Sequence, residues 1–475
     1  MRHERSHTKV IATLGPASLK KDVLAQLFEE GIDVCRLNFS HGTHENHLDA
    51  IKLIRELNEH FSSNVAILAD MQGPKLRIGE MKDDGVELTE GKELWFVNKP
   101  CMGTSEKVFM SYQPLASDVQ PGEHILVDDG KIKLEVLETN GKDSVKTKVI
   151  CGGALSSNKG VNLPNTKISL PSLTEKDIED AKFALEHGVD WIALSFVRSV
   201  TDILELKELI KQSKRPSARV IAKIEKPEAL REIDQIIDMA DGIMVARGDL
   251  GVEVPFDQVP LIQKEIVAKC IERSKPVIIA TQMMESMITN FRPTRAEAND
   301  VANAVLDGAD AVMLSGETSV GKYPVGVVNS MQKIIDWTEK AYTYYRDNPP
   351  REFTRTFLSD SICYNACKMA EQTSAKAIIT FTHSGYTAFR IASHRPDVDI
   401  FAFTDNERLL KKLSLVWGVR AFLSKEFQNI DDYIDYSIRQ LLEMNHIQEE
   451  DVVIHVGSTP IPERGRTNMI KLSYV

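Results

Sequence analysis

The sequence predicts an α/β protein built on a (β/α)8 barrel of the TIM type, with a small β-barrel domain inserted into it and a C-terminal α/β domain after it. Three observations support this fold class. Eight short apolar runs alternate with amphipathic helical stretches along the 475-residue chain. The helix-to-strand joints repeat the pattern Gly-X-Asp at 31–33, 188–190 and 308–310. Between Asp70 and about Leu170 the helical period disappears, and strand-like alternation replaces it.

The eight apolar runs are mostly rich in Val and Ile, as expected for parallel strands that are buried on both faces. They lie at Lys9–Thr13, Asp33–Leu37, Val65–Asp70, Asp190–Ser195, Val220–Ile224, Gly242–Ala246, Pro276–Thr281 and Asp310–Ser315. The helical patterns between them include Thr174–His187, Pro260–Arg273 and Thr294–Leu306. Glycine at each repeated joint would end the preceding helix in a left-handed conformation. Eight such units predict a closed parallel barrel.

The interruption after the third strand predicts a separate β domain. Its alternating runs are separated by turn residues and lie at Val86–Leu88, Glu93–Val97, His124–Val127, Lys131–Leu134 and Ser144–Val149. After about Asn348, strands at Ala377–Thr380, Asp399–Phe403 and Val452–Val456 alternate with helices such as Ser359–Gln372. We therefore predict a barrel over 1–72 and 170–345, an inserted lid domain over 73–169 and a C-terminal regulatory domain over 346–475.

Composition limits the partners of the chain. The formal net charge is −11, from 58 Lys and Arg residues against 69 Asp and Glu residues. A chain this acidic is not expected to bind nucleic acid or an anionic membrane over a broad surface. The N-terminus shows no secretory signal, and no apolar run reaches the roughly 18 residues needed to span a bilayer. The six cysteines form no CxxC pair. These features predict a cytoplasmic protein with reduced thiols.

Charged or hydroxyl side chains stand at the ends of all eight predicted strands, where barrels of this type build their active sites. Glu225 and Asp249 follow adjacent strands, and two hard oxygen ligands suit Mg²⁺ or Mn²⁺. Arg36, Lys223 and Arg247 stand around them, which favours a phosphorylated or carboxylated substrate. Phosphoryl transfer depends largely on such positioning and charge neutralisation. The alternative is an ion-pair network in which the cations only neutralise the acids.

No Walker A sequence and no kinase-type glycine loop is present, so a phosphoryl-transfer enzyme here belongs to another class. Seven segments resemble the pyruvate kinase family, in order, along nearly the whole chain. They are Arg36–Gly42, Asp70–Arg77, Lys159–Pro164, Ala222–Glu225, Met244–Glu253, Ala280–Met287 and Met313–Thr318. The resemblance implies phosphoryl transfer from phosphoenolpyruvate to ADP, giving pyruvate and ATP, in the last step of glycolysis. It also implies a homotetramer with a site for a phosphorylated allosteric effector.

The resemblance also implies roles for single residues. Glu225 and Asp249 would bind the divalent ion, Lys223 would stabilise the phosphoryl group in flight, and Arg36 would contact the phosphate. The backbone of Gly248 and Asp249, with Thr281, would hold the substrate carboxylate.

A second group of residues serves the nucleotide and the proton. Arg77 and Lys159 would contact nucleotide phosphates, joined by Asn38 and His41. The water relay that protonates enolpyruvate would include Thr281, Ser315 and Glu317, without one of them being singled out as the acid.

One segment departs from the pattern of K⁺-dependent family members, which bind the ion with residues corresponding to Asn38, Ser40, Asp70 and Met71. Those enzymes have Thr at the position of Met71 and a carboxylate at the position of Lys75. The sequence therefore resembles the K⁺-independent bacterial branch, in which Lys75 would supply the positive charge. The alternative is that Lys75 is a solvated residue at the domain hinge and that K⁺ still binds.

The segment Thr382–Thr387 lies between a predicted strand and a predicted helix. Its hydroxyls and glycine (Thr382, Ser384, Gly385, Thr387) at a helix N-terminus suit a phosphate. A well-capped helix would explain the same residues. By resemblance this loop takes the effector, with Arg464 and Arg466 as further phosphate ligands. Fructose 1,6-bisphosphate, AMP or a sugar monophosphate would each fit.

Two rival functions follow from the same residues. A metal-dependent aldolase or lyase acting on pyruvate or phosphoenolpyruvate would explain Glu225, Asp249 and an arginine. It would not explain the inserted domain or Lys159. A catalytically idle regulator on the same fold is disfavoured, because Arg36 and Lys223 are intact.

Overall fold

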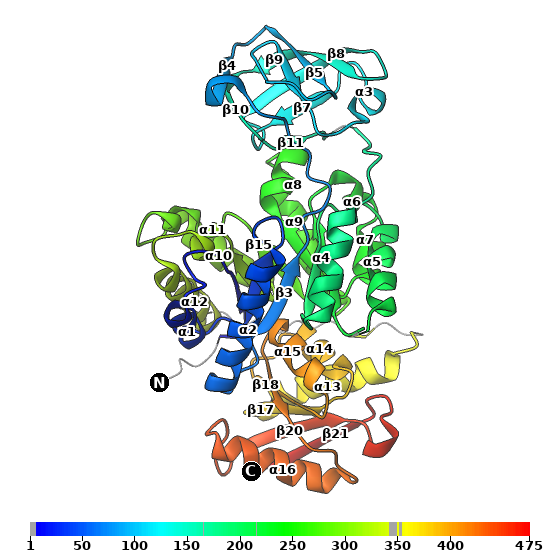
Figure 1. Cartoon of the computed structure of the whole chain (residues 1–475). Coiled ribbons are helices and arrows are strands. Elements are labelled where there is room, and N and C mark those ends of the chain that lie inside the picture. The colour runs from blue at the N-terminus through cyan, green and yellow to red at the C-terminus, as the bar shows by residue number, and fades with distance from the viewer. Residues whose placement is uncertain (1–5, 165, 215, 342–348, 351–353) are drawn as a thin grey trace.

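The computed structural model describes residues 6–164, 166–214, 216–341, 349–350 and 354–475. The barrel lies in the middle of the molecule, with the inserted domain above it and the C-terminal domain below it (Figure 1). The predicted boundary between residues 345 and 346 falls outside the described residues. Within the described ranges, every helix is too short or too polar to cross a membrane.

The predicted barrel is confirmed, and each of its eight strands lies within one residue of the predicted limits. The strands are parallel and close in the order β1-β16-β15-β14-β13-β12-β3-β2. They are β1 (Lys9–Thr13), β2 (Val34–Asn38), β3 (Ala66–Asp70), β12 (Trp191–Leu194), β13 (Arg219–Ile224), β14 (Gly242–Ala246), β15 (Val277–Ala280) and β16 (Ala311–Leu314).

Helices surround the barrel and bury their apolar faces against the strands. They are α1 (Lys21–Glu29), α2 (His44–Phe61), α4 (Glu175–Glu186), α5 (Val200–Gln212), α6 (Pro227–Arg231), α7 (Ile233–Met239), α8 (Arg247–Glu253), α9 (Val259–Glu272), α10 (Arg295–Asp307), α11 (Gly316–Ser319) and α12 (Pro324–Ala341), with the 3-10 turn η2 (Glu285–Ile288). Capping boxes start several of them, as Thr174 and Asp177 do for α4. The glycines of the three repeated joints all have positive φ, as predicted.

Four aspartates at the lower end of the barrel make a repeated contact that we call the carboxylate clamps. Each lies just before an even-numbered strand of the barrel and accepts the backbone N–H of a residue at or near the start of the preceding strand. The pairs, with their distances, are Asp33 and Val10 (2.9 Å), Asp190 and Ile67 (2.9 Å), Asp241 and Val220 (2.9 Å), and Asp310 and Val277 (3.1 Å). The clamps join strands one to two, three to four, five to six and seven to eight, and so help to set the strand register.

Two apolar clusters hold the barrel together. One fills the space between the strands and the helices. The other fills the barrel interior, where Trp191 and Met244 are fully buried. The interior is therefore a packed core, and polar chemistry is left to the strand ends.

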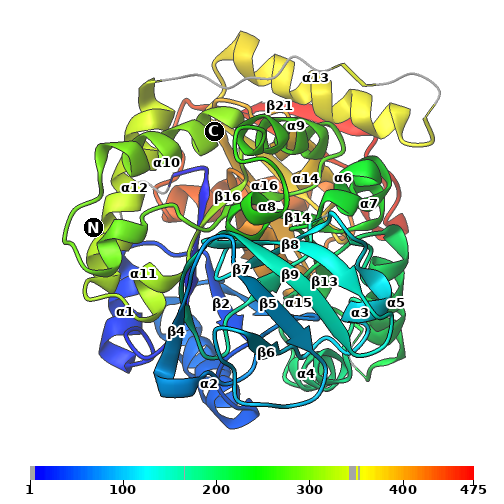
Figure 2. The ribbon, with the colours of Figure 1, turned by 90° about the horizontal axis from the view of Figure 1, so that it is seen from above.

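The inserted domain is a β domain, as predicted. It has the sheet order β11-β7-β8-β9-β5-β6 and a separate β10-β4 pair. Its elements are β4 (Gly85–Leu88), β5 (Glu93–Val97), β6 (Lys107–Phe109), β7 (His124–Val127), β8 (Ile132–Thr139), β9 (Ser144–Cys151), β10 (Gly153–Ser156), β11 (Val161–Asn162), α3 (Leu115–Asp118) and η1 (Lys82–Asp84). Single bridges from Arg77 to Gly160 and from Ile78 to Met110 connect the two sheet edges through one segment, which gives the barrel-like closure. Seen from above, this domain covers part of the barrel end (Figure 2).

A glycine hinge joins the inserted domain to β3. Gly73 has φ of +67°, and a Cβ there would lie 2.8 Å from the ring of Phe196, so another residue would be strained. The Gly73 N–H donates to Asp177 at 3.0 Å, which ties the hinge to the capping box of α4.

The C-terminal domain is a five-stranded sheet in the order β19-β18-β17-β20-β21, with helices on both faces. Its elements are α13 (Phe357–Thr373), β17 (Ala377–Phe381), α14 (Tyr386–Ser393), β18 (Asp399–Thr404), α15 (Glu407–Lys412), η3 (Leu413–Leu415), β19 (Val419–Leu423), α16 (Ile430–Glu443), β20 (Val452–Gly457), η4 (Ile461–Glu463) and β21 (Met469–Tyr474). Strands β19 and β21 were not predicted, because they are edge strands of mixed polarity.

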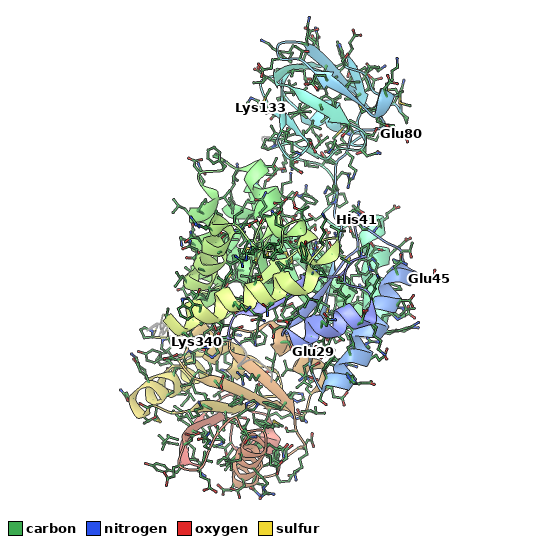
Figure 3. The ribbon with its side chains drawn as sticks, turned by 90° about the vertical axis from the view of Figure 1, so that its left-hand side faces the viewer. Glu29, His41, Glu45, Glu80, Lys133 and Lys340 are labelled. Atoms are coloured by element: carbon green, nitrogen blue, oxygen red, sulfur yellow. The ribbon has the colours of Figure 1, made fainter. Side chains whose placement is uncertain are left out.

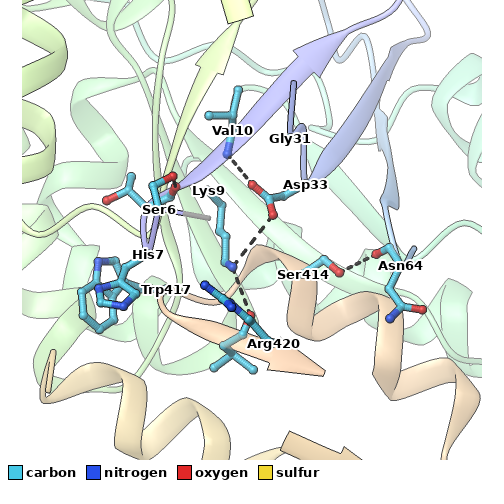
Figure 4. Close-up of polar contacts among 12 residues, drawn as sticks. Ser6, His7, Lys9, Val10, Gly31, Asp33, Asn64, Ser414, Trp417 and Arg420 are labelled. Atoms are coloured by element: carbon cyan, nitrogen blue, oxygen red, sulfur yellow. Dashed lines mark hydrogen bonds and ion pairs between the residues drawn. The ribbon is translucent and has the colours of Figure 1, made fainter. Parts of the chain in front are cut away.

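Buried polar contacts fix this domain to the lower end of the barrel. Lys9 Nζ donates to the carbonyl of Val419 at 3.0 Å and lies 3.9 Å from Asp33 (Figure 4). Arg395, which is 2% exposed, pairs with Asp310 at 2.9 Å. The C-terminal domain therefore contacts the Asp310 clamp directly, and it reaches the Asp33 clamp through Lys9.

Candidate active site

Four charged side chains from the ends of β2, β3 and β13 form a connected network at the upper end of the barrel. Arg36 Nε donates to Asp70 Oδ2 at 2.7 Å. Lys223 Nζ lies 3.2 Å from Asp70 Oδ1 and 3.0 Å from Glu225 Oε1. The Asp70 and Glu225 side chains are each 1% exposed, while Lys223 is 12% exposed. The two carboxylates of the network are therefore buried, while its two cations remain partly accessible from the barrel mouth.

The electrostatics of the network favour the charged forms of Asp70 and Lys223. Burial raises the pKa of Asp70, but Lys223 and Arg36 outweigh it and hold that pKa below its ordinary value. Burial lowers the pKa of Lys223, yet Asp70 and Glu225 outweigh it and raise that pKa above its ordinary value. Lys223 is therefore a fixed positive charge at neutral pH.

Two hydroxyl groups, not singled out by sequence reasoning, hold the two cations. Lys223 Nζ donates to Ser195 Oγ at 2.7 Å, and Ser195 Oγ donates to the carbonyl of Met71 at 2.7 Å. Arg36 Nη1 donates to Thr13 Oγ1 at 2.9 Å. Both hydroxyls stand at predicted strand ends, so the position was visible in the sequence and the partner was not.

Glu225 and Asp249 are candidate ligands for a divalent cation. Burial raises the pKa of Glu225, Lys223 opposes that shift, and the nearby charge of Asp249 adds to it. Glu225 Oε1 is buried, and its polar contact is the ion pair with Lys223 at 3.0 Å. Two carboxylates close together fit a hard cation. The described residues contain no cluster of three or more ligating side chains, so substrate oxygens and water would complete the shell.

The end of β15 and the start of α8 meet at Thr281. The Gly248 N–H donates to Thr281 Oγ1 at 2.7 Å, and Thr281 has φ of 68°, a strained value for a β-branched residue. Thr281 thus lies beside the first turn of α8, which carries Asp249. Strain of this kind concentrates at functional sites, which is consistent with the predicted role.

Arg247 does not join the network, and the expectation that it surrounds the carboxylate pair is wrong. Its guanidinium forms a bidentate pair with Asp300, at 2.7 Å for each bond, and donates to the carbonyl of Thr281 at 2.7 Å. Arg247 therefore supports the β15 loop. Its place at a strand end could not reveal the direction of its side chain.

Ser315 and Glu317 follow β16 at the same end of the barrel. The buried Glu317 carboxylate accepts the N–H of Ser315 at 2.7 Å and that of Met284 at 3.1 Å. This carboxylate orients two loops in the structure. A role in a water relay stays a prediction.

The predicted nucleotide residues fall into two groups. Arg77 and Lys159 lie in the inserted domain, where Arg77 donates to the carbonyl of Asn158 at 2.8 Å and Lys159 pairs with Asp128 at 2.8 Å. Asn38 ends β2, and His41 is exposed at the barrel end nearest the inserted domain (Figure 3). One group therefore lies on the inserted domain and the other at the upper end of the barrel.

The residues predicted for a monovalent cation lie at the ends of β2 and β3 and in the hinge. Asn38 Oδ1 accepts the N–H of Ser40 at 3.1 Å, and Met71 is buried. Lys75 is exposed and borders a cavity between the inserted domain and the barrel, together with Asp249. The side chain of Lys75 thus stands at the site entrance.

The predicted effector loop lies in the C-terminal domain between β17 and α14. Thr382 Oγ1 accepts the N–H of Gly385 at 2.9 Å, and Thr387 bonds Thr467 at 2.7 Å. Arg464 Nη1 lies 3.3 Å from the ring nitrogen of His383 in the same loop. Ser384 is exposed. Arg464 and His383 border a cavity of about 620 Å³ that Thr382, Ser384, Gly385 and Thr387 do not line, whereas Arg466 donates to the carbonyl of Arg355.

A parallel barrel with paired cations and carboxylates at the C-terminal ends of its strands defines a class of enzymes that act on anionic substrates. Comparison with known proteins identifies the family. The pyruvate kinase barrel-domain model matches residues 5–328, and the pyruvate kinase alpha/beta-domain model matches residues 360–473. The chain belongs to the pyruvate kinase family, whose members are phosphotransferases.

Relatives named pyruvate kinase are similar to this chain over nearly its full length. The pyruvate kinase of Corynebacterium glutamicum is 46% identical over 463 residues, covering 98% of this chain and 96% of the relative. That of Geobacillus stearothermophilus is 43% identical over 471 residues, covering 98% and 80%. The crystal structure of a Cryptosporidium parvum pyruvate kinase matches with a TM-score of 0.92 and 35% identity, covering 99% of this chain and 96% of the other. These relatives are kinases, and not the lyases raised as an alternative.

Proposed function

We propose that this chain transfers the phosphoryl group of phosphoenolpyruvate to ADP and releases pyruvate and ATP. The observation that carries the proposal is the Arg36–Asp70–Lys223–Glu225 network at the barrel mouth, in a chain of this family. Asp70 holds both cations, so their charge is positioned before the substrate arrives. The decisive assay measures ATP formed from phosphoenolpyruvate and ADP with Mg²⁺. Absence of ATP from the folded enzyme would reject the proposal.

The residues divide the work of binding and transfer. Arg36 donates from Nε to Asp70 and from Nη1 to Thr13, so Nη2 is left to donate to a phosphate oxygen. Lys223 spends its donors on Ser195, Asp70 and Glu225, and an incoming phosphoryl group would replace one of these contacts. An ammonium is a compact charge, and it suits a group whose charge moves during transfer. Gly248 and Thr281 would orient the substrate carboxylate.

A divalent ion, Mg²⁺ or Mn²⁺, is part of the proposal, held by Glu225 and Asp249. When bound it would neutralise charge on the substrate oxygens. Removal of divalent ions with a chelator should abolish turnover, and Mg²⁺ or Mn²⁺ should restore it. Full activity in the chelated enzyme would contradict this assignment.

Independence from K⁺ is a further part of the proposed function. Lys75, at the hinge, would supply the positive charge that K⁺ supplies in other members of the family. In tetramethylammonium buffer free of K⁺ the enzyme should turn over at its full rate. Lys75→Ala should lower that rate, and added K⁺ should recover part of it. Strong activation of the unaltered enzyme by K⁺ would contradict the assignment.

Regulation and assembly complete the proposal. Thr382, Ser384, Gly385 and Thr387, with Arg464 and Arg466, would bind a phosphorylated effector.

A homotetramer would cover large apolar side chains that are exposed in the single chain: Phe256 (84%), Leu261 (71%) and Phe291 (66%). We also propose a cytoplasmic location, because all six cysteines are free thiols and four are buried. Light scattering tests the tetramer, and a monomer at assay concentration would reject it.

A further inference from the structure

The carboxylate of Glu253 joins three parts of the molecule. Its Oε1 accepts Lys226 Nζ at 2.5 Å and the side-chain amide of Asn162 at 2.8 Å. Glu253 is the last residue of α8, Lys226 follows β13, and Asn162 belongs to β11 of the inserted domain. Figure 1 shows β11 directly above α8.

Each partner lies next to a residue of the candidate site. Lys226 directly follows the metal-ligand candidate Glu225. Asp249 stands one helical turn before Glu253 on α8, and Lys159 lies three residues before Asn162. A shift of Glu253 would therefore be felt at both the metal-binding edge and the nucleotide side of the site.

This junction is buried although it lies between domains. The Glu253 side chain is 1% exposed and that of Lys226 is 7% exposed. The ammonium also lies 5.8 Å from the ring centre of Phe196, beside the hinge. A buried ion pair gains little stability over an apolar packing of the same size. Its directional hydrogen bonds do fix relative position, which suggests a geometric role for the carboxylate.

We propose that Glu253 is a positioning residue that sets the inserted domain against the barrel edge carrying Glu225 and Asp249, with Asn162 as its contact on the inserted domain. This proposal rests on the proposed kinase function only for its kinetic readout. Loss of the Asn162 contact leaves the barrel network intact but loosens the placement of Arg77 and Lys159. The consequence is a higher KM for ADP and a smaller change in the KM for phosphoenolpyruvate.

The experiment compares Asn162→Ala with Asn98→Ala. Asn98 lies in the same domain, and its side-chain amide donates to the carbonyl of Lys142, a contact within that domain. Both purified variants are assayed for KM of ADP and of phosphoenolpyruvate. Amide hydrogen exchange is followed without substrates over residues 153–164 and over α8. Asn162→Asp tests the donor itself, because it keeps the shape and places a carboxylate opposite Glu253.

Asn162→Ala should raise the KM for ADP about tenfold, the size of one hydrogen bond to a charged group. Exchange in both segments should rise, Asn162→Asp should exceed Asn162→Ala in both effects, and Asn98→Ala should match the unaltered enzyme. Unchanged KM for ADP and unchanged exchange in Asn162→Ala would overturn the proposal, as would unaltered behaviour of Asn162→Asp. Failure of the unaltered enzyme to make ATP would reject the kinase function alone, because the exchange measurement needs no turnover.

Discussion

The barrel mouth and the loop before α14 are two candidate phosphate sites built in opposite ways. At the mouth, Arg36 and Lys223 are 11–12% exposed and are held by the buried carboxylates of Asp70 and Glu225. At the loop, Arg464 is 48% exposed and pairs with Asp405 and Glu426 at the surface. Charges that act on a reacting group must not reorganise during the reaction, whereas a bound regulator can order an exposed side chain. The difference teaches which site is built for chemistry.

The two regions also bury titratable groups differently. The mouth buries charges in pairs. The C-terminal domain buries His455, on β20, as a single neutral ring, because burial lowers its pKa to about 4. Variants of the two regions test this contrast, and the largest effect is expected at the mouth.

Replacing the central cation should have the largest effect. Lys223→Met should lower kcat by on the order of 10³-fold, as loss of cationic groups does in phosphoryl transfer. Initial rates of ATP formation measure it, with Lys52→Met on the surface of α2 as the control. Near-normal turnover of a folded Lys223→Met enzyme would show that the mouth network is structural.

Lowering the pH should reduce the stability of the C-terminal domain through its buried histidine. The folded pKa of His455 lies below the value of about 6.5 expected when unfolded, so its contribution is complete above about pH 6.5 and falls as the pH drops toward 4. The free energy of unfolding of the C-terminal domain should decrease by about 2 kcal/mol from this group between about pH 7 and pH 5. Denaturant titrations measure it.

His455→Leu should remove that part of the pH dependence, while His60→Leu on the surface of α2 should retain it. An identical acid response in His455→Leu and the unaltered protein would mean that this ring is not the titrating group.

The hydroxyl beneath Lys223 should matter less than the cation itself. Ser195→Ala removes the acceptor of Lys223 and the link to the Met71 carbonyl. We expect kcat to fall about tenfold, the effect of one hydrogen bond to a charged group. Ser330→Ala, which removes a hydroxyl that donates to the carbonyl of Gly326 within α12, is the matched control. If both variants retain the unaltered kcat, Ser195 does not position the ammonium.

The smallest effect is expected at the exposed loop. Arg464→Ala should raise the half-activating concentration of fructose 1,6-bisphosphate, used as the probe, by about threefold, since surface charges contribute little. Activation curves measure it, with the exposed Arg439→Ala on α16 as control. Equal curves for the two variants would argue against a role for Arg464 in effector binding.

Much of the fold was predictable from the sequence because barrel strands buried on both faces leave continuous apolar runs. Short or edge strands such as β6, β10, β11, β19 and β21 bury one face or less, and their pattern is too weak to detect. Motif positions likewise located Lys223, Glu225 and Asp249 at one edge. Contacts between residues far apart in the sequence could not be predicted, such as the hydrogen bond from Lys223 to Ser195 or that from Asn162 to Glu253. Side-chain direction was also hidden, as Arg247 shows.

The carboxylate clamps have a consequence for how such a protein can change over generations. Strand pairs one–two, three–four, five–six and seven–eight each carry a clamp at the lower end, 3.1 Å or shorter, on the side away from the mouth. Substitutions at the mouth therefore leave the register of each pair in place. A scaffold of four similarly clamped strand pairs can therefore accept changes in the residues of its mouth while its lower end stays fixed.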